Sequence, residues 1–324
     1  MGKSALIFGV SGQDGAYLTQ FLLEKGYRIF GASRDAQLTS FANLRALGIQ
    51  GAVQTLSANP ADFRSVLDAI TKAEPHEIYN LAGQSSVGLS FEQPVDTFSS
   101  IGIANLTLLE AIRFLGGNIR YYNAGSSECF GNTPEPATEE TPFHPRSPYA
   151  VAKAAAFWQV ANYREAYGLF ACSGILFNHE SPLRPERFAT QKIVRAACRI
   201  AAGSKETLTL GNMDIARDWG WAPDYVAAMW AMLQGDTADD YIVATGRTCS
   251  LREFTSAVFQ FCGIDWQEHV RQDTTLMRPS DIAMSSANPD KAACILHWRT
   301  RHVMEDVARL LIEAERQRVL SAGG

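Results

Sequence analysis

Five side chains between residues 126 and 153 have types and spacing suited to proton transfer: Ser126, Ser127, Glu128, Tyr149 and Lys153. If Tyr149 opens a helix, Lys153 follows four residues later on the same face. An ammonium group there favours the phenolate, so we expect Lys153 to lower the pKa of Tyr149 from its usual value of about 10. A tyrosine that titrates near neutral pH can take a proton from a sugar hydroxyl while a nicotinamide takes the hydride.

Glu128 adds a second base, which the oxidation of a simple alcohol does not require. Two bases and a hydride acceptor together predict an oxidation followed by an elimination. The pattern Tyr-x-x-x-Lys also occurs by chance in many helices, so this interpretation depends on a cofactor-binding element elsewhere in the chain.

That element is predicted at the start of the chain. Residues 4–10 form an apolar run, Gly9, Gly12 and Gly15 follow at a spacing of three, and an apolar helical stretch then ends at Gly26. Glycines permit the tight turn from strand to helix and the close approach of the backbone to a pyrophosphate, which the helix N-terminus binds. No Gly-Lys-Ser/Thr follows, which argues against a nucleotide triphosphatase loop.

The end of the second predicted strand, residues 27–33, bears on the choice of cofactor. An acidic residue at this place binds the ribose hydroxyls of NAD, whereas a basic residue accommodates the 2′-phosphate of NADP. Arg34 and Asp35 stand there side by side. Because Arg34 comes first, we favour NADP, and Asp35 keeps NAD as the alternative.

The composition sets bounds on the function. With 324 residues, 46% hydrophobic content and a net charge of −5, the chain can bury a large core and has no basic footprint for nucleic acid. No stretch approaches about 20 apolar residues and no signal-peptide pattern is present, so we expect a cytoplasmic protein without a membrane span. The scattered cysteines are expected to be buried thiols rather than disulfides or metal ligands, and no metal site is predicted; they are Cys129, Cys172, Cys198, Cys249, Cys262 and Cys294.

Strand-like and helix-like segments alternate, which predicts an α/β fold with a Rossmann-like, doubly wound parallel sheet and a smaller substrate-binding lobe. The expected strands are residues 4–9, 27–33, 52–56, 77–81, 119–124 and 170–177, and the expected helices lie near 14–25, 61–72, 102–115 and 148–167. Residues 1–178 and about 213–247 are assigned to the cofactor-binding part, and residues 179–212 and 248–324 to the lobe. The active site is expected in the cleft at the carboxyl ends of the strands.

With these residues in place, the chain resembles the extended short-chain dehydrogenase/reductases and, among them, the GDP-mannose 4,6-dehydratase family. The resemblance runs nearly end to end and rests on these segments: 9–15, 78–85, 126–128, 145–153, 174–182, 210–212, 217–220 and 278–279. It implies an enzyme, a hydro-lyase, that converts GDP-mannose to GDP-4-keto-6-deoxymannose. The sugar is oxidised at C4, water is eliminated across C5 and C6, and the hydride stored on NADP returns to C6.

The resemblance also implies a role for individual residues. Ser126 would orient the 4-hydroxyl, Tyr149 would act as its base, Lys153 would bind the nicotinamide ribose, and Glu128 would remove the C5 proton. The implied cofactor contacts are Gly9, Gly12, Gln13, Asp14, Gly15, Arg34, Asn59, Leu81, Ala82, Gln84, Lys153, His179 and Arg184. The implied substrate contacts are Ser85, Ser126, Glu128, Tyr149, Asn178, Lys192, Gly211, Arg217 and Arg278. The expected assembly is a homodimer or homotetramer built on helices 102–115 and 148–167, with no nucleic-acid or membrane partner.

The chain departs from the family pattern at Asp35, at Ala58-Asn59, at Ser86, at Gly125 and at Asp281. These departures bear on the cofactor and on the sugar, and GDP-manno-heptose is the alternative substrate. A 4-keto reductase of the same fold would not need the carboxylate of Glu128. A cofactor-binding regulator without activity would be expected to have lost Tyr149 or Lys153.

Overall fold

A seven-stranded parallel sheet forms the centre of the larger part of the molecule in this computed structural model, which describes residues 2–276 and 280–322. In spatial order the strands are β11 (Tyr241–Val243), β7 (Ala171–Leu176), β5 (Arg120–Ala124), β4 (Glu77–Asn80), β1 (Ser4–Phe8), β2 (Arg28–Ser33) and β3 (Val53–Ser57). The order reverses next to β1, as in doubly wound folds. The predicted α/β class is therefore confirmed, and each of the six expected strands is present.

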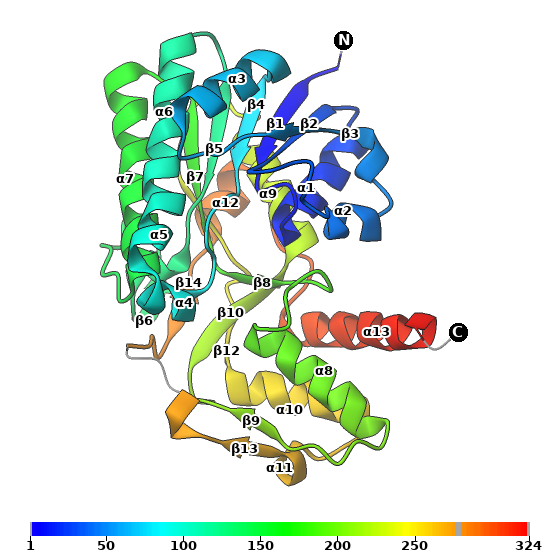
Figure 1. Ribbon diagram of the computed structural model, residues 1–324. Helices are drawn as coiled ribbons and strands as arrows, with labels where there is room; N and C mark the ends of the chain where they lie inside the picture. The colour runs from blue at the N-terminus through cyan, green and yellow to red at the C-terminus, as the bar shows by residue number, and fades with distance from the viewer. Residues whose placement is uncertain (1, 277–279, 323–324) are drawn as a thin grey trace.

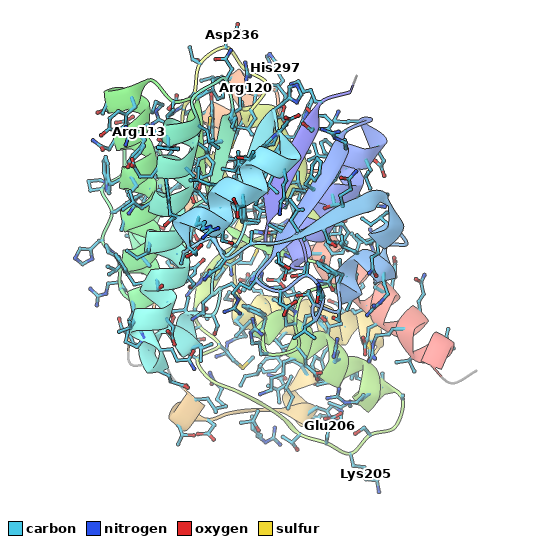
Figure 2. All side chains as sticks on the ribbon, turned by 45° about the horizontal axis from the view of Figure 1, so that its top comes forward. Arg113, Arg120, Lys205, Glu206, Asp236 and His297 are labelled. Carbon is cyan, nitrogen blue, oxygen red and sulfur yellow. The ribbon has the colours of Figure 1, made fainter. Side chains whose placement is uncertain are left out.

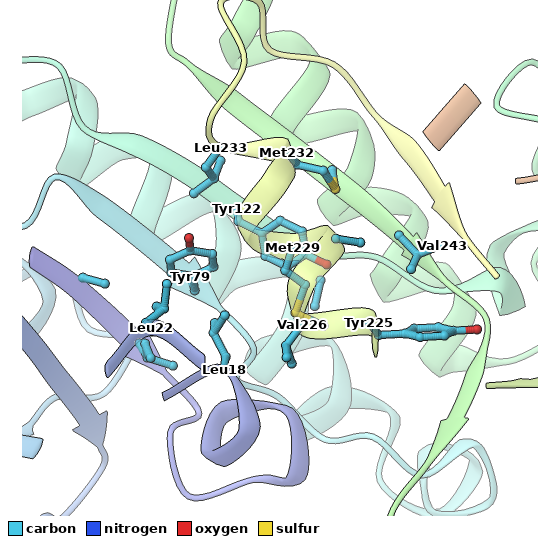
Figure 3. Packing of buried hydrophobic residues seen from close by; sticks show 14 of the residues in the cluster. Leu18, Leu22, Tyr79, Tyr122, Tyr225, Val226, Met229, Met232, Leu233 and Val243 are labelled. Carbon is cyan, nitrogen blue, oxygen red and sulfur yellow. The ribbon is translucent and has the colours of Figure 1, made fainter. Parts of the chain in front are cut away.

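Helices cover both faces of this sheet (Figure 1). The first face carries α1 (Gln13–Glu24), α2 (Ala42–Ala46) and α9 (Ala222–Met232), and the second carries α3 (Phe63–Ala73), α6 (Ala104–Leu115) and α7 (Pro148–Tyr167). Successive residues of a strand point to opposite faces, so Ile7 joins the first core while Leu6 and Phe8 join the second. Figure 3 shows the first core, where Leu18 and Leu22 of α1 and Met229 of α9 pack beside Tyr79 and Tyr122 of the sheet.

The boundaries of α7 follow from local chemistry. Ser147 is its N-cap, and its Oγ accepts a hydrogen bond from the backbone N–H of Ala150 at 3.1 Å. Pro148 fits the first helical position, where no intrahelical N–H bond is needed. Gly168 ends the helix with a φ of 67°, which glycine adopts without strain. These signals place Tyr149 and Lys153 in the first two turns, on the side of the helix that faces the sheet.

The helical stretch Pro94–Leu115 contains α5 (Pro94–Phe98), a π-helical turn at Ser99–Ile103 (η2) and α6. By length and composition it could cross a membrane, contrary to our expectation that no stretch is long and apolar enough. However, 44% of the apolar 18-residue window within it is buried, and the stretch packs against α3 and α7. This packing is that of a core helix in a folded domain.

The smaller lobe lies below the carboxyl ends of the large sheet in Figure 1. It contains a three-stranded sheet of β8 (Asn178–Glu180), β10 (Ala216–Trp221) and β12 (Thr248–Ser250), and a pair formed by β9 (Leu208–Leu210) and β13 (Val270–Gln272). Its helices are α8 (Ala189–Ala201), α10 (Leu251–Cys262), α11 (Trp266–His269) and α13 (Met304–Ala322). A separate hydrophobic core inside the lobe joins α8, α10 and α13.

The chain divides between the two parts differently from the expected boundaries at two places. β10 pairs with β8 and β12 of the lobe, although residues from about 213 were assigned to the large part. Conversely, β14 (Ser285–Ala287) pairs with β6 (Thr133–Ala137), and α12 (Asp290–Ile295) packs on β11 of the large sheet. The remaining short elements are η1 (Gln50–Ala52), α4 (Val87–Glu92), η3 (Ser127–Phe130) and η4 (Thr274–Leu276). Cys294 of α12 is exposed, contrary to the expectation that the cysteines are buried.

Candidate active site

A cavity of about 510 Å³ lies at the carboxyl ends of the large sheet and is closed on the other side by the lobe. Many of the residues that the sequence singled out line this one cavity: Asp14, Leu81, Ala82, Gln84, Ser85, Ser126, Glu128, Tyr149, Lys153, Asn178, His179, Arg184, Lys192, Gly211 and Arg217. They come from segments that are far apart in the sequence. Their convergence makes this cavity the candidate active site.

The glycine turn beside the cavity has the shape that a dinucleotide phosphate requires. A Cβ at Gly9 would lie 2.7 Å from the carbonyl carbon of Leu81, and a Cβ at Gly15 would collide with the carbonyl oxygen of Gly9. Gly12 is the N-cap of α1, and no side chain caps this helix start. Backbone N–H groups at an uncapped helix start bind anions, so the turn fits the pyrophosphate of a nicotinamide dinucleotide.

Tyr149 and Lys153 lie together on the floor of the cavity, and both are buried. The Lys153 Nζ donates a hydrogen bond to the carbonyl oxygen of Ala124 at 2.7 Å and lies 5.8 Å from the centre of the Tyr149 ring. Burial lowers the pKa of Lys153 to about 8, so its ammonium is mostly charged at neutral pH.

The structure does not give the predicted lowering of the Tyr149 pKa by Lys153. Burial raises the pKa of Tyr149 above its usual value, and a hydrogen bond with Ser126 offsets only part of this rise. The cause is desolvation, which penalises the phenolate and which the spacing of two residues in a sequence does not reveal. The charge of Arg184 lowers the pKa of Tyr149, so positive charge from the lobe side also favours the phenolate.

Ser126 and Glu128 reach the same cavity from the short helix η3, which follows β5. The Ser126 Oγ accepts a hydrogen bond from the backbone N–H of Glu128 at 3.3 Å, which fixes the two residues relative to each other. Gly125, one of the departures from the family pattern, fits a close contact, since a Cβ there would lie 2.9 Å from the carbonyl oxygen of Gly174. The serine, the carboxylate and the tyrosine therefore converge from two elements on one space.

Asp14 and His179 join the start of α1 to β8 across the cavity wall. The His179 Nε2 lies 2.9 Å from the Asp14 Oδ2, and its Nδ1 lies 2.7 Å from the carbonyl oxygen of Phe177. Burial alone would raise the pKa of Asp14, but the charge and hydrogen bond of His179, the hydrogen bond from Gln13 and the charge of Arg184 together lower this pKa to about 2. Burial lowers the pKa of His179, whereas Asp14 raises it more, so the pKa of His179 lies above its usual value. Both ring nitrogens face acceptors, which favours the imidazolium.

A further polar contact crosses this junction: the Ser181 Oγ donates to the Gln13 Oε1 at 2.8 Å. Within the lobe, the Gln191 Nε2 donates to the carbonyl oxygen of Ser181 at 2.8 Å. Glu180 is buried and accepts a hydrogen bond from the Thr190 Oγ1 at 2.7 Å. Gln13 itself does not line the cavity, so the structure gives it a supporting place behind Asp14.

The lobe contributes several cations to the cavity. Arg184 lies 3.5 Å from Glu180 and stacks over the ring of Phe188 at 3.8 Å. The Lys192 Nζ donates to the carbonyl oxygen of Thr209 at 2.7 Å from an exposed side chain. Arg217 is buried and donates to the carbonyl oxygen of Ile282 at 2.8 Å. Charged side chains therefore enter the cavity chiefly from the lobe.

A few expected contact residues lie outside the cavity lining. Gly9, Gly12 and Gly15 form the turn behind it. Arg34 follows β2 and Asn59 follows β3, both with exposed side chains. Arg278 falls outside the described residues.

Arg187, Phe188, Thr190, Trp219 and Leu251 also line the cavity, although sequence reasoning assigned none of them a role there. Arg187 and Phe188 lie close after Arg184, so proximity to a recognised segment was an available signal. Leu251 and Trp219 come from elements whose place in the lobe only the fold reveals. Within residues 2–276 and 280–322, no cluster of three or more potential metal-binding side chains occurs.

Comparisons with known proteins place the chain among relatives. The family model of GDP-mannose 4,6 dehydratase matches residues 6–311. GDP-mannose 4,6 dehydratase 1 of Arabidopsis thaliana is 44% identical, with 99% of this chain and 93% of that protein covered. The human GDP-mannose 4,6 dehydratase is 39% identical, with 97% of this chain and 92% of that protein covered.

Solved structures agree on the fold. UDP-glucose 4-epimerase of Thermus thermophilus, solved with NAD, superposes with a TM-score of 0.84 at 26% identity, covering 97% of this chain and 99% of that chain. RMD of Pseudomonas aeruginosa, solved with NADPH, superposes with a TM-score of 0.79 at 22% identity, covering 98% of this chain and 99% of that chain. The glycine turn, the converging Ser126, Glu128, Tyr149 and Lys153, and the full-length relatives lead to one conclusion: the chain belongs to the GDP-mannose 4,6-dehydratase family of the extended short-chain dehydrogenase/reductase fold.

Proposed function

We propose that this protein is a hydro-lyase that converts GDP-mannose to GDP-4-keto-6-deoxymannose. The observation that carries the proposal is the convergence of Tyr149, Lys153, Ser126 and Glu128 on one cavity beside the glycine turn. A reductase of the same fold would need the first three side chains but not the carboxylate. Full-length similarity to relatives named as GDP-mannose 4,6-dehydratases supports the choice of sugar nucleotide.

In this proposal each side chain holds or moves a proton at a defined atom of the sugar. Ser126 orients the 4-hydroxyl by hydrogen bonding, and Tyr149 removes its proton. Lys153 holds the cofactor ribose and adds positive charge near the phenol. Glu128 removes the C5 proton, which the 4-ketone has made acidic, and assists departure of the C6 hydroxyl as water. When bound, a nicotinamide would supply hydride uptake and return, and its positive charge would favour the phenolate of Tyr149.

The remaining site residues are proposed to divide between the two ligands. The seven-stranded part would hold the cofactor through the turn at Gly9 to Gly15, and the lobe would hold GDP through the cations Lys192 and Arg217. Diphosphate oxygens favour charge-assisted donors of this kind. Asn178 and Gly211 would complete the sugar-nucleotide contacts. Cytoplasmic location stays a prediction.

NADP is the proposed form of the cofactor. The Asp35 Oδ1 accepts hydrogen bonds from the backbone N–H groups of Gln37 at 2.9 Å and Leu38 at 3.0 Å. This carboxylate oxygen is therefore engaged by the backbone of the turn that follows it, which argues against a role as the ribose ligand of NAD. Arg34 beside it is exposed at the end of β2. Arg34→Ala should weaken NADP binding more than NAD binding in a fluorescence titration. Equal losses of affinity for NADP and NAD would mean that Arg34 does not recognise the 2′-phosphate.

The decisive test is incubation of purified protein with GDP-mannose and, separately, with GDP-manno-heptose. The proposal expects GDP-mannose to lose the mass of one water, with no net consumption of NADP. Faster loss of water from GDP-manno-heptose would transfer the assignment to the heptose. A reduced 4-keto sugar formed at the expense of NADPH would instead indicate a reductase.

We also propose a homodimer as the minimal assembly. Several large apolar side chains of α5, η2 and α7 are exposed although these helices pack together: Val95, Phe98, Ile103, Val151 and Trp158. Exposed apolar patches of this kind commonly form interfaces between copies. Light scattering at micromolar concentration should give at least twice the monomer mass, and a monomer would contradict the proposal.

A further inference from the structure

The peptide unit between Ser11 and Gly12, in the glycine turn, is held at both of its polar ends. The Gly12 N–H donates a hydrogen bond to the carbonyl oxygen of Gly9 at 3.0 Å. The carbonyl oxygen of Ser11 accepts a hydrogen bond from the Asn43 Nδ2 at 2.9 Å. In a trans peptide the N–H and C=O groups point in opposite directions, so the two bonds together fix the orientation of the peptide plane.

The two bonds come from different parts of the fold. The bond to Gly9 lies within the turn itself, whereas Asn43 belongs to α2, 32 residues after Ser11 and beside α1 in Figure 1. A carbonyl oxygen can only accept a hydrogen bond, so the NH₂ group of the Asn43 amide must face it. Neither Ser11 nor Asn43 lines the cavity, so Asn43 contacts the turn from behind.

The hydrophobic core holds α2 in the place that this contact requires. Phe41, the N-cap of α2, has a φ of 46° and a ψ of 39°, which is the left-handed region that residues other than glycine rarely adopt. Its side chain is buried in the first core together with that of Leu44. Such a backbone conformation persists only where the surrounding packing enforces it. The burial of Phe41 and Leu44 therefore fixes Asn43 opposite the turn.

The segment before α2 is fixed as well. The Thr39 Oγ1 donates to the carbonyl oxygen of Asp35 at 2.6 Å and lies 2.6 Å from the Ser33 Oγ. One end of this segment carries Arg34, which is proposed to bind the 2′-phosphate of NADP, and the other end carries Asn43 beside the glycine turn. The two residues thus lie at different places along the proposed dinucleotide site, which allows their effects to be separated.

We propose that Asn43 is a positioning residue for dinucleotide binding, because its amide keeps the Ser11 carbonyl turned toward α2. The first N–H groups of a helix have no partner within the helix and attract an anion, whereas a carbonyl oxygen facing the same anion repels it. Without the Asn43 amide the Ser11 peptide is free to rotate and to present its oxygen to the phosphates. The inference rests on the proposed cofactor site and is independent of the sugar nucleotide.

The experiment titrates NADP and NAD separately, following the quenching of protein fluorescence. Asn43→Leu keeps a similar volume and removes the donor. Both Kd values should rise by the same factor, about three- to tenfold, because both dinucleotides carry the pyrophosphate and a neutral hydrogen bond is lost. Asn43→Gln retains a donor and should recover most of the affinity, whereas Arg34→Ala should weaken NADP more than NAD.

Asn118→Leu is the matched control, since it makes the same change at an exposed position in the loop before β5, at the opposite end of the sheet. This variant should bind both dinucleotides like the wild type.

Thermal unfolding without ligand separates positioning from mere attachment of α2. If Asn43→Leu lowers the unfolding midpoint but leaves both Kd values at their wild-type levels, Asn43 only holds α2 in place and the proposal is overturned. A loss of affinity confined to NADP would also overturn it, because Asn43 would then act at the 2′-phosphate. Since the readout is dinucleotide binding, a wild type that fails to dehydrate GDP-mannose would contradict the proposed function and not this inference.

Discussion

The two walls of the cavity are built in different ways. The sheet wall is formed by residues 81–88, 124–128, Tyr149 and Lys153; in it Ser126, Tyr149 and Lys153 are buried, whereas residues 81–88 are partly or fully exposed. The lobe wall is formed by residues 178–192 and 209–219 with Leu251 and Leu276; of its cations, Arg184, Arg187 and Lys192 are partly or fully exposed and Arg217 is buried. We infer that the sheet wall positions the groups proposed for acid–base chemistry. The lobe wall supplies most of the positive charge proposed to bind the sugar nucleotide. Substitutions on the two walls should therefore change different kinetic quantities.

The largest effects are expected for the acid–base residues of the sheet wall. Tyr149→Phe removes the first base and should suppress both C4 oxidation and dehydration. Glu128→Gln leaves Tyr149 and Lys153 in place, so it should still oxidise C4 while dehydration falls by roughly 10²–10⁴. Reduced cofactor and loss of water, measured separately, distinguish the two variants. If Glu128→Gln dehydrates the sugar at the wild-type rate, Glu128 has no role in the elimination.

The glycine turn provides a matched pair. Gly9 has a φ of 86° and a Cβ there would lie 2.7 Å from backbone atoms of Leu81, whereas a Cβ at Gly12 would meet only the Gly9 carbonyl oxygen at 3.3 Å. Gly9→Ala should cost about 1–3 kcal/mol from backbone strain and abolish cofactor binding, and Gly12→Ala should be milder. Chemical denaturation and cofactor titration check both. Equal losses for the two would mean that the close contact at Gly9 is not limiting.

On the lobe wall, Lys192→Ala should raise KM for GDP-mannose by roughly tenfold with little change in kcat, since a lost charge-assisted hydrogen bond is worth about 1.5–3 kcal/mol and solvent exposure reduces that value. Lys205→Ala is the control, because Lys205 is an exposed lysine at the outer end of the lobe (Figure 2). Steady-state kinetics on the two variants decide the matter. A fall in kcat without a change in KM would mean that Lys192 acts in the catalytic steps rather than in substrate binding. The proposed difference between the two walls would then be wrong for this residue.

The smallest effect concerns the junction between the walls. His179→Gln removes the ion pair with Asp14. Because the pKa of His179 is raised in the folded protein, its stabilising contribution is complete below the ordinary pKa of 6.5 and is lost as the pH rises through the folded value. The difference in unfolding free energy between wild type and variant should therefore be about 1 kcal/mol at pH 6 and shrink by pH 9. Urea denaturation at both values measures it, and a constant difference would show that His179 stays neutral.

Much of the sheet wall could be predicted from the sequence because local signals specify it. Buried parallel strands read as continuous apolar runs, and Ser147, Pro148 and Gly168 mark the ends of α7. The lobe wall was less predictable, since β8, β10 and β12 have three to six residues each and pair with strands distant in sequence. Arg217 illustrates the limit: its type suggested a diphosphate contact, yet its guanidinium also holds the carbonyl of Ile282, a contact set only by tertiary packing.

The link between Asp14 and His179 has a thermodynamic consequence for the whole molecule. It joins the helix start that is proposed to hold the cofactor phosphates to the strand that opens the lobe. If binding at one end strengthens this link, binding at the other end gains by the same factor, because such coupling is reciprocal. Cofactor and GDP should therefore raise each other's affinity by the same factor, so that a loaded cofactor is released least readily when the sugar nucleotide is present.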